Sequence, residues 1–241
     1  MESVKAVFFD LDNTLCDYWA SSRQALTDVM DMVGGCYPGR DMDTMRRDYF
    51  RVSREAQAAA GSPGFLHEFS RAERFAAMLH RHEIRDEELA ARLADLFESQ
   101  IIARLTLFDD ALPVLDTLKS RLYIGVLSNG HSAVQREKLA SLKIGHYFES
   151  VFISEEVGIA KPDPAIFAHV LDATGFAPSE VAYVGDSQDQ DVPGARIAGV
   201  VSVWLNRRKR EPDPTFALPD HMIATLTEML PLLGYAEPAL R

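Results

Sequence analysis

The chain has 241 residues, of which 47% are apolar and 25% charged, so it is long enough for one large domain or for a domain with an insertion. Its net charge of −11 argues against a general nucleic-acid binder, and its two cysteines, Cys16 and Cys36, are too few for the disulfide framework of a small secreted protein. No apolar run approaches the ~20 residues that span a bilayer, and the first residues lack a signal-peptide pattern, so we expect a cytoplasmic protein without a membrane partner.

The chain begins with an apolar run over Val4–Phe9, which predicts a short buried strand. From about residue 17 to residue 104 the pattern is helical, with apolar side chains at helical spacing, as in Leu89 and Leu93. These stripes predict the seams of a four-helix bundle. Breaker residues such as Gly34-Gly35 and Pro38-Gly39 separate the expected helices. The expected helices are Tyr18–Val33, Met42–Ala60, Phe65–Arg81 and Asp86–Leu105.

Beyond Phe108 the pattern alternates between strands and helices, which predicts parallel strands joined by right-handed crossovers, with the apolar first strand in the middle of the sheet. We therefore expect an α/β fold. A Rossmann-like parallel sheet over 1–16 and 106–241 would form the core, with an all-helical insertion over 17–105 after the first strand. The expected strands are Tyr123–Leu127, Ser150–Ile153, Val181–Val184, Val200–Leu205 and Met222–Ile223. The expected helices are Ala111–Leu118 (with Asp109 or Asp110 as its cap), Ala133–Leu142, Ala165–Thr174, Val192–Ala198 and Thr225–Leu233.

Two carboxylates, Asp10 and Asp12, stand where the first strand ends, before the turn-like Asn13-Thr14. At positions i and i+2 of a strand they share one face, and ligands of open α/β sheets bind at this end of the strands. Two like charges this close are unfavourable unless a cation, a proton or a substrate group relieves them. The alternative is a polar strand end in which one aspartate caps a turn.

Two further polar clusters follow predicted strands. Ser128-Asn129-Gly130 ends one strand, where a hydroxyl and turn N–H groups can hold a phosphoryl oxygen, although a turn with a serine helix cap fits as well. Lys161 precedes Pro162, which restricts it to an extended backbone, and a lysine fixed there can neutralise carboxylates and a transferring phosphoryl group. Taken alone, Lys161 would be an ordinary surface lysine.

A cluster of acids follows the strand Val181–Val184, with Asp186, Asp189 and Asp191 within six residues. Magnesium, which takes one or two carboxylates together with water and phosphate oxygens, would explain such a cluster. The helix macrodipole is the alternative, and it accounts for Asp189 and Asp191 better than for Asp186. Adjacent parallel strands would bring a common set of side chains to one edge of the sheet: Asp10, Asp12, Ser128, Lys161 and Asp186.

The four motifs together resemble those of the haloacid dehalogenase superfamily of phosphohydrolases, and they occur in that family's order across nearly the whole core. The helical insertion resembles the family's cap domain, which closes over the site and contributes to substrate choice. The matching residues are Asp10-x-Asp12-x-Thr14, the strand that ends in Ser128, Lys161 in Lys-Pro-Asp-Pro, and Gly185-Asp186 followed by Asp191.

The resemblance implies a role for each matching residue. Asp10 would be the nucleophile that forms an aspartyl-phosphate, and Asp12 would be the general acid and base. Thr14 would orient their loop. Ser128 and the backbone of Asn129 would bind the phosphoryl group.

The resemblance also implies a magnesium site. Lys161 would stabilise the charge on the phosphoryl group. Asp10, the backbone carbonyl of Asp12, and Asp186 would hold Mg²⁺, with Asp191 among or beside the groups that contact these ligands. The presence of Asp12 excludes, within the resemblance, the dehalogenases, which lack this second aspartate and need no metal.

We therefore expect a Mg²⁺-dependent phosphatase that hydrolyses small phosphomonoesters, acting as a monomer or homodimer on a phosphorylated metabolite. The stretches 128–130, 154–162 and 204–206 are similar to the pyrimidine 5′-nucleotidase branch and so indicate nucleoside 5′-monophosphates. Similar stretches occur in sugar-phosphate, acylneuraminate-phosphate and phosphoglycolate phosphatases. A phosphomutase and a non-catalytic binding protein on the same scaffold are the remaining alternatives.

Three residues that follow the first motif, Tyr18, Trp19 and Arg23, are candidates to face the substrate. Their alternative role is to pack the helical insertion onto the core. The basic run Arg207–Arg210 lies in a predicted loop before Pro212, and a run this short is typical of a solvated surface rather than of a nucleic-acid site.

Overall fold

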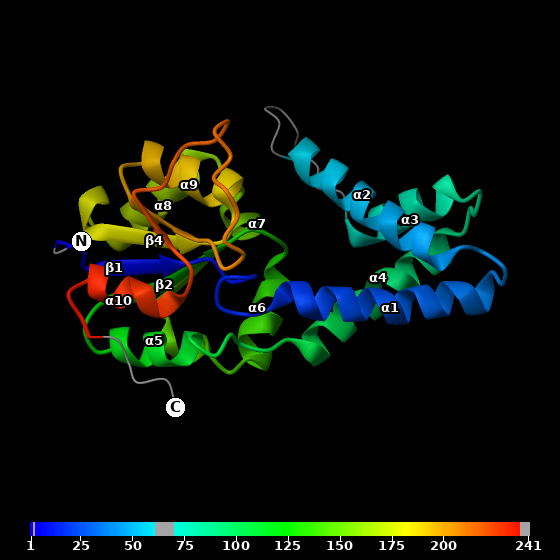
Figure 1. Cartoon of the computed structure of the whole chain (residues 1–241), viewed down its shortest axis with the longest axis horizontal. Coiled ribbons are helices and arrows are strands. Elements are labelled where there is room, and N and C mark those ends of the chain that lie inside the picture. The colour runs from blue at the N-terminus through cyan, green and yellow to red at the C-terminus, as the bar shows by residue number, and fades with distance from the viewer. Residues whose placement is uncertain (2, 61–69, 237–241) are drawn as a thin grey trace. The chain divides into compact units, whose positions relative to one another are not determined.

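The computed structural model describes residues 1, 3–60 and 70–236. The chain divides into two compact units, of which one comprises residues 1–18 and 105–241 and the other residues 19–104. The first unit is an α/β unit and the second is helical (Figure 1). Within the described residues, no helix combines the length and the apolar character needed to cross a membrane.

The α/β unit is built on a six-stranded sheet in the order β3-β2-β1-β4-β5-β6, and every strand pair is parallel. The predicted place of the first strand in the middle of the sheet is therefore confirmed. A central parallel strand is buried on both faces, and all four residues of β1 are buried. The strands are β1 (Ala6–Phe9), β2 (Tyr123–Ser128), β3 (Ser150–Ile153), β4 (Val181–Gly185), β5 (Val201–Leu205) and β6 (His221–Ile223).

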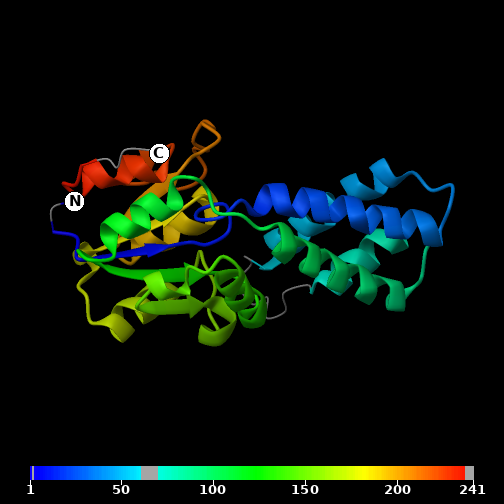
Figure 2. The same cartoon turned by 90° about the horizontal axis from the view of Figure 1, so that it is seen from below.

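Helices cover both faces of the sheet, as Figures 1 and 2 show. Successive side chains of a strand point to opposite faces, so Val7 and Phe9 join one apolar core while Ala6 and Phe8 join the other. The Phe9 side packs against α5 (Ala111–Leu118), α6 (Ser132–Ser141) and α10 (Met229–Leu232). The Phe8 side packs against α8 (Pro164–Thr174) and α9 (Gln188–Ile197). Full burial of each phenylalanine contributes about 2–3 kcal/mol.

Two predicted helices of the α/β unit depart from the sequence prediction by more than one residue, and the short helix α7 (Ser154–Val157) was not predicted. Helix α9 begins at Gln188 rather than Val192, so the acids Asp189 and Asp191 lie in its first turn, where the macrodipole favours them. The predicted final helix over Thr225–Leu233 is a 3₁₀ turn, Leu226–Glu228, followed by the short helix α10.

The helical unit contains the four predicted helices: α1 (Tyr18–Cys36), α2 (Met42–Ala60), α3 (Arg71–Arg81) and α4 (Glu87–Arg104). The predicted break at Gly34-Gly35 is wrong, because α1 continues through both glycines and ends before Pro38. Glycine costs a helix only about 1 kcal/mol, whereas proline lacks the N–H and excludes further turns. Part of the third predicted helix, over residues 65–69, lies outside the described residues.

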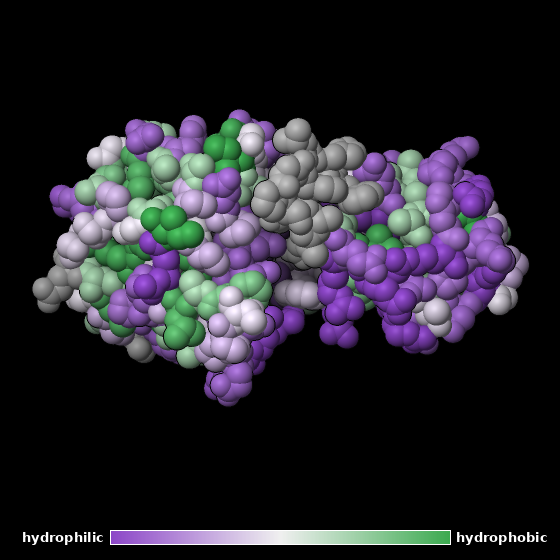
Figure 3. Space-filling model, turned by 90° about the horizontal axis from the view of Figure 1, so that it is seen from above, coloured by the Kyte–Doolittle hydropathy of each residue, from purple (hydrophilic) through white to green (hydrophobic). Residues whose placement is uncertain are grey.

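The helical unit has its own core. Tyr49 stacks on Phe75 with ring centroids 4.3 Å apart, and both rings contact Phe97 edge-on. Ser70 and Glu73 form a capping box that fixes the start of α3. The face of these helices seen in Figure 3 is mostly hydrophilic, as expected for helices whose apolar stripes pack on one another.

Candidate active site

The predicted site residues stand at the carboxyl ends of neighbouring strands. Asp10 follows β1, Ser128 ends β2 and Asp186 follows β4. The register pairs Phe9 with Val126 and with Val184, so these strand ends lie at a similar level of the sheet. The loop over residues 10–17, which follows β1, is called the first loop below. The main-chain N–H of Asp10 donates to the Val184 carbonyl at 2.8 Å, which fixes the start of this loop against β4.

Lys161 joins three of the side chains at this edge. Its Nζ lies 2.8 Å from Asp10 Oδ1, 2.7 Å from Asp191 Oδ1 and 2.6 Å from the Tyr183 hydroxyl. The Lys161 side chain is 2% exposed, so all three N–H groups of its ammonium find partners in the protein interior. The alternative of a surface lysine is therefore excluded.

Burial shapes the protonation of this cluster. Desolvation raises the pKa of Asp10 to about 6, against the opposing pull of Lys161. Burial by itself would lower the pKa of Lys161, but Asp10 and Asp191 more than offset it and raise that pKa. Burial, followed by the charges of Asp191 and Asp10, raises the pKa of Tyr183 well above its usual value. The site therefore contains a permanent ammonium beside a carboxylate that is costly to ionise.

Asp191 reaches the site because α9 begins close to the end of β4. Its Oδ2 accepts a hydrogen bond from the Ser187 N–H at 2.9 Å while its Oδ1 pairs with Lys161. A Cβ at Gly185 would lie 2.2 Å from Asp191 Oδ2, so a side chain at position 185 would collide with this carboxylate. Asp189, by contrast, is exposed and accepts from the Ser187 hydroxyl.

The Asp186 carboxylate has no cationic partner among the described residues. Its side chain has no hydrogen-bond donor or ion-pair partner within the part of the chain that the structure describes. Burial, and then the charges of Asp191 and Asp10, raises the pKa of Asp186 well above its usual value. Its main-chain carbonyl is fixed by the Trp204 indole N–H at 3.0 Å.

This donor set fits magnesium. Asp10 and Asp186 supply carboxylate oxygens, and Mg²⁺ is typically held by one or two carboxylates while water and phosphate oxygens complete its shell. Across residues 1, 3–60 and 70–236, no three His, Cys, Asp or Glu side chains are grouped as a ready-made metal cage. A metal bound here would therefore rely on oxygens other than side-chain carboxylates for most of its ligands.

Asn129 anchors the main chain of Lys161 with two hydrogen bonds. Its Nδ2 donates to the Lys161 carbonyl at 2.9 Å, and its Oδ1 accepts from the Lys161 N–H at 3.0 Å. Ser128 is buried in the last position of β2, so it is not a helix cap. Its hydroxyl accepts a 2.6 Å hydrogen bond from Gln135 Nε2.

Asp12 forms an ion pair with a second lysine, Lys138. Its Oδ2 lies 2.5 Å from Lys138 Nζ and 3.4 Å from Gln135 Nε2. The Tyr18 ring lies against the same ammonium, 4.6 Å from Nζ to the ring centroid. Thr14, fully buried, places its hydroxyl 3.5 Å from Asp10 Oδ2.

Gln135, Lys138 and Tyr183 were missed at the level of the sequence, although each left a signal. Gln135 and Lys138 interrupt the apolar stripe that α6 shares with Leu139 and Leu142, and a polar residue in such a stripe needs a buried partner. Tyr183 stands in an otherwise apolar central strand, where its hydroxyl must find a partner.

The first loop is braced from outside the site by Arg207 and Asp110. The Arg207 guanidinium contacts both Asp110 oxygens at 2.8 Å and donates to the Thr14 carbonyl at 3.1 Å. Asp110 stands at the predicted N-cap position of α5, but its side chain makes no cap hydrogen bond and accepts instead from the Leu226 N–H. Arg207, the first residue of the basic run, is therefore a structural residue rather than a solvated one.

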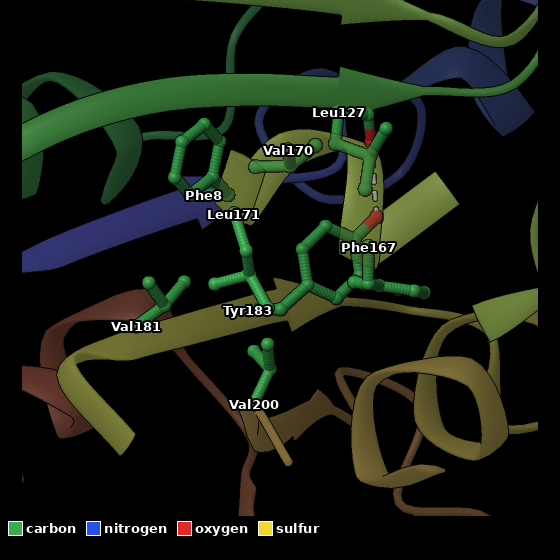
Figure 4. A pocket seen from close by; sticks show the side chains of 8 residues that line it. All are labelled: Phe8, Leu127, Phe167, Val170, Leu171, Val181, Tyr183 and Val200. Atoms are coloured by element: carbon green, nitrogen blue, oxygen red, sulfur yellow. Dashed lines mark hydrogen bonds between the residues drawn. The ribbon is translucent and has the colours of Figure 1, made fainter. Parts of the chain in front are cut away.

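A small cavity lies in the apolar core on the Phe8 side of the sheet. Figure 4 shows side chains from β1, β2, β4 and α8 around it, with a hydrogen bond from the Tyr183 hydroxyl to the Leu127 carbonyl. Its volume of about 10 Å³ holds one water at most, so it is not a metabolite site. Trp19, which belongs to the helical unit, is 41% exposed.

Comparison with known proteins identifies a protein family and several relatives that are similar to this chain. The family model of haloacid dehalogenase-like hydrolases matches residues 4–199. N-acylneuraminate-9-phosphatase of Mus musculus is 28% identical over 97% of this chain and 95% of its own length. Glyceraldehyde 3-phosphate phosphatase of Methanopyrus kandleri is 32% identical over 94% of this chain and 96% of its own.

A third relative and a solved structure match different extents of the chain. Pyrimidine 5′-nucleotidase of Escherichia coli is 34% identical, but over 59% of this chain and 63% of its own length. The magnesium-bound structure of a HAD-hydrolase from Bacillus subtilis covers 95% of this chain and 98% of its own, with a TM-score of 0.81. Its sequence identity of 22% limits that likeness to the fold.

Proposed function

Because this chain belongs to the haloacid dehalogenase-like hydrolases, we propose that it is a Mg²⁺-dependent phosphatase that hydrolyses small phosphomonoesters through a phosphorylated Asp10. The observation that carries the proposal is the contact between Asp10 and the buried ammonium of Lys161, at the end of the central strand. A fixed positive charge beside a carboxylate suits a reaction in which that carboxylate meets a phosphate dianion.

In the first half of the proposed reaction, a carboxylate oxygen of Asp10 attacks phosphorus and the bond from phosphorus to the ester oxygen breaks. Asp12 gives its proton to the departing oxygen, so that the product leaves as an alcohol. In the second half, Asp12 takes a proton from water, whose oxygen attacks phosphorus. The bond between Asp10 and phosphorus then breaks and releases inorganic phosphate.

The remaining residues bind and orient the phosphoryl group. Lys161 supplies positive charge, and the Ser128 hydroxyl with the Asn129 main chain supplies hydrogen bonds. Thr14 orients the first loop. Mg²⁺ would be held by Asp10, the Asp12 carbonyl and Asp186, where it would neutralise negative charge and orient the phosphate. Asp191, paired with Lys161, would lie beside these ligands without binding the metal.

Two observations bear on the substrate class. The core stretches that indicate nucleoside 5′-monophosphates are supported by the nucleotidase relative, whose match covers 63% of its length. The relatives that match nearly end to end, helical unit included, are phosphatases named for a phosphorylated acylneuraminate and for glyceraldehyde 3-phosphate. Phosphorylated sugars and trioses are therefore the second candidate class. We assign the helical insertion, residues 17–105, the role of a cap that selects among them.

Phosphate release tests the proposed function. The full chain is assayed with Mg²⁺ on dUMP, dTMP, UMP, phosphoglycolate, glyceraldehyde 3-phosphate and acylneuraminate and sugar phosphates, and kcat/KM is compared. Excess chelator should stop turnover and added Mg²⁺ should restore it. Undiminished phosphate release in chelator would contradict the metal role, and an isomeric ester without free phosphate would indicate a mutase.

The matched control for the nucleophile is an acid that stands outside the Lys161 cluster. Asp10→Asn should abolish phosphate release, whereas Asp189→Asn, which changes an exposed carboxylate, should leave it close to the wild-type rate. Turnover in Asp10→Asn at the wild-type rate would refute the assignment of Asp10.

A further inference from the structure

Helix α6 presents two buried polar side chains to Asp12. Gln135 and Lys138 are each 2% exposed, and their spacing of three residues places them on the same face of the helix. Lys138 Nζ lies 2.5 Å from Asp12 Oδ2, and Gln135 Nε2 lies 3.4 Å from the same oxygen. One oxygen of Asp12 is thus held from one side by a single helix.

The burial of Lys138 requires a compensating interaction for its charge. Lysine is almost never fully buried without a charged partner, and among the described residues Asp12 is the one carboxylate that forms an ion pair with Lys138. The Tyr18 ring covers the same ammonium. A hydrophobic residue would fill this part of α6 at lower cost, so the charge serves Asp12 rather than the packing of the helix.

Gln135 connects Asp12 to Ser128 and Asn129, the residues proposed to bind the phosphoryl group. Its Nε2 lies 2.6 Å from the Ser128 hydroxyl and 3.3 Å from the Asn129 carbonyl, in addition to its contact with Asp12. The direction of the Asp12 carboxylate and the position of the Ser128 hydroxyl are therefore set by the same side chain. Lys138 adds the charge and Gln135 adds the link to the phosphoryl site.

We propose that Lys138, together with Gln135, is a positioning residue that aims the Asp12 carboxyl group at the leaving-group oxygen. This inference rests on the proposed function, in which Asp12 gives a proton to that oxygen and is left as a carboxylate. Because Lys138 contacts Oδ2, the proton that Asp12 gives up is carried by Oδ1, and the Lys138 ammonium stabilises the carboxylate that remains. Within the described residues, Lys138 forms its ion pair with Asp12 and not with the nucleophile Asp10.

The test is the dependence of the rate on the leaving group. Phenyl phosphate and p-nitrophenyl phosphate have nearly the same shape, but nitrophenolate leaves with little help whereas phenolate needs a proton. In Lys138→Met we expect kcat/KM for phenyl phosphate to fall about 10²-fold, the lower end of a general acid's contribution, and kcat/KM for p-nitrophenyl phosphate to change little. A purely structural role would lower both rates equally, and that result would overturn the inference.

Two controls keep the result interpretable. Lys143→Met removes an exposed lysine just beyond α6 and should leave the ratio of the two rates unchanged. If Lys138→Met fails to fold, Lys138→Gln keeps a donor without the charge and should shift the ratio in the same direction. Wild-type hydrolysis of p-nitrophenyl phosphate that Asp10→Asn abolishes supports the proposed function independently. A wild-type chain inert toward both esters would overturn that function and this inference together.

Discussion

Lys161 and Asp191, which are 30 positions apart, form a 2.7 Å ion pair whose side chains are 2% and 3% exposed. Asp191 is thus a second carboxylate in contact with the ammonium that also binds Asp10. Burial makes both charges dependent on each other, because neither can be solvated by water. This dependence separates Asp191 from Asp189, an acid of the same helical turn that stays at the surface.

Asp191→Ala should lower the free energy of unfolding by about 3 kcal/mol, because it removes a buried partner of Lys161 together with the acceptor of the Ser187 N–H hydrogen bond. Asp189→Ala, the matched control, should change it by less than about 0.5 kcal/mol. Urea unfolding of both variants in chelator measures the difference. Equal stability of the two variants would show that the buried pair does not support the fold.

Asp10→Asn should stabilise the metal-free protein at neutral pH. The folded pKa of Asp10 is raised from 3.8 to about 6, so the folded state holds its proton more tightly than the unfolded state. Wild-type stability therefore falls as pH rises from about 4 to about 6, by roughly 2–3 kcal/mol, and the asparagine variant lacks this loss. Thermal unfolding of both proteins from pH 4 to pH 7 in chelator tests this, and parallel curves would contradict it.

Asp12→Asn should destabilise the protein, in contrast to Asp10→Asn. It leaves the buried Lys138 ammonium without its carboxylate, at a cost of about 2 kcal/mol. The double variant Asp12→Asn/Lys138→Met removes both charges and should recover most of that loss. A double-mutant cycle of unfolding free energies gives the coupling directly, and additive losses would show that the two side chains do not interact.

Arg207→Lys should lower the thermal midpoint by about 5 °C, since a loss of roughly 2 kcal/mol corresponds to a few degrees per kcal/mol in a chain of this size. Lysine lacks the planar fork with which the guanidinium binds both oxygens of Asp110 and reaches the Thr14 carbonyl. Arg208→Lys changes the exposed neighbour and serves as the control. Equal thermal midpoints for the two variants would show that the Arg207 guanidinium does not stabilise the first loop.

The central place of the first strand and the chemistry of the strand ends were predictable, because both follow from local pattern. The apolar run before Asp10 predicts a central strand, and the βα alternation places Ser128 and Asp186 at the same edge. Helix ends were harder, as in α1, where two glycines lower helix stability without ending the helix and Pro38 does. Nothing local distinguishes a tolerated glycine from a helix terminus.

The sequence by itself determined the fold class and the carboxylates at the strand ends. Both follow from the local order of apolar and polar residues, because apolar runs form the buried strands and the polar residues after them mark the strand ends. Only the tertiary structure decided that Lys161 pairs with Asp10 and Asp191, and that Asp12 belongs to Lys138 instead. Folding brings together charges that are far apart in the sequence, and the partner of each lysine is the carboxylate that is buried beside it. That choice is made by packing, which no single stretch of sequence contains.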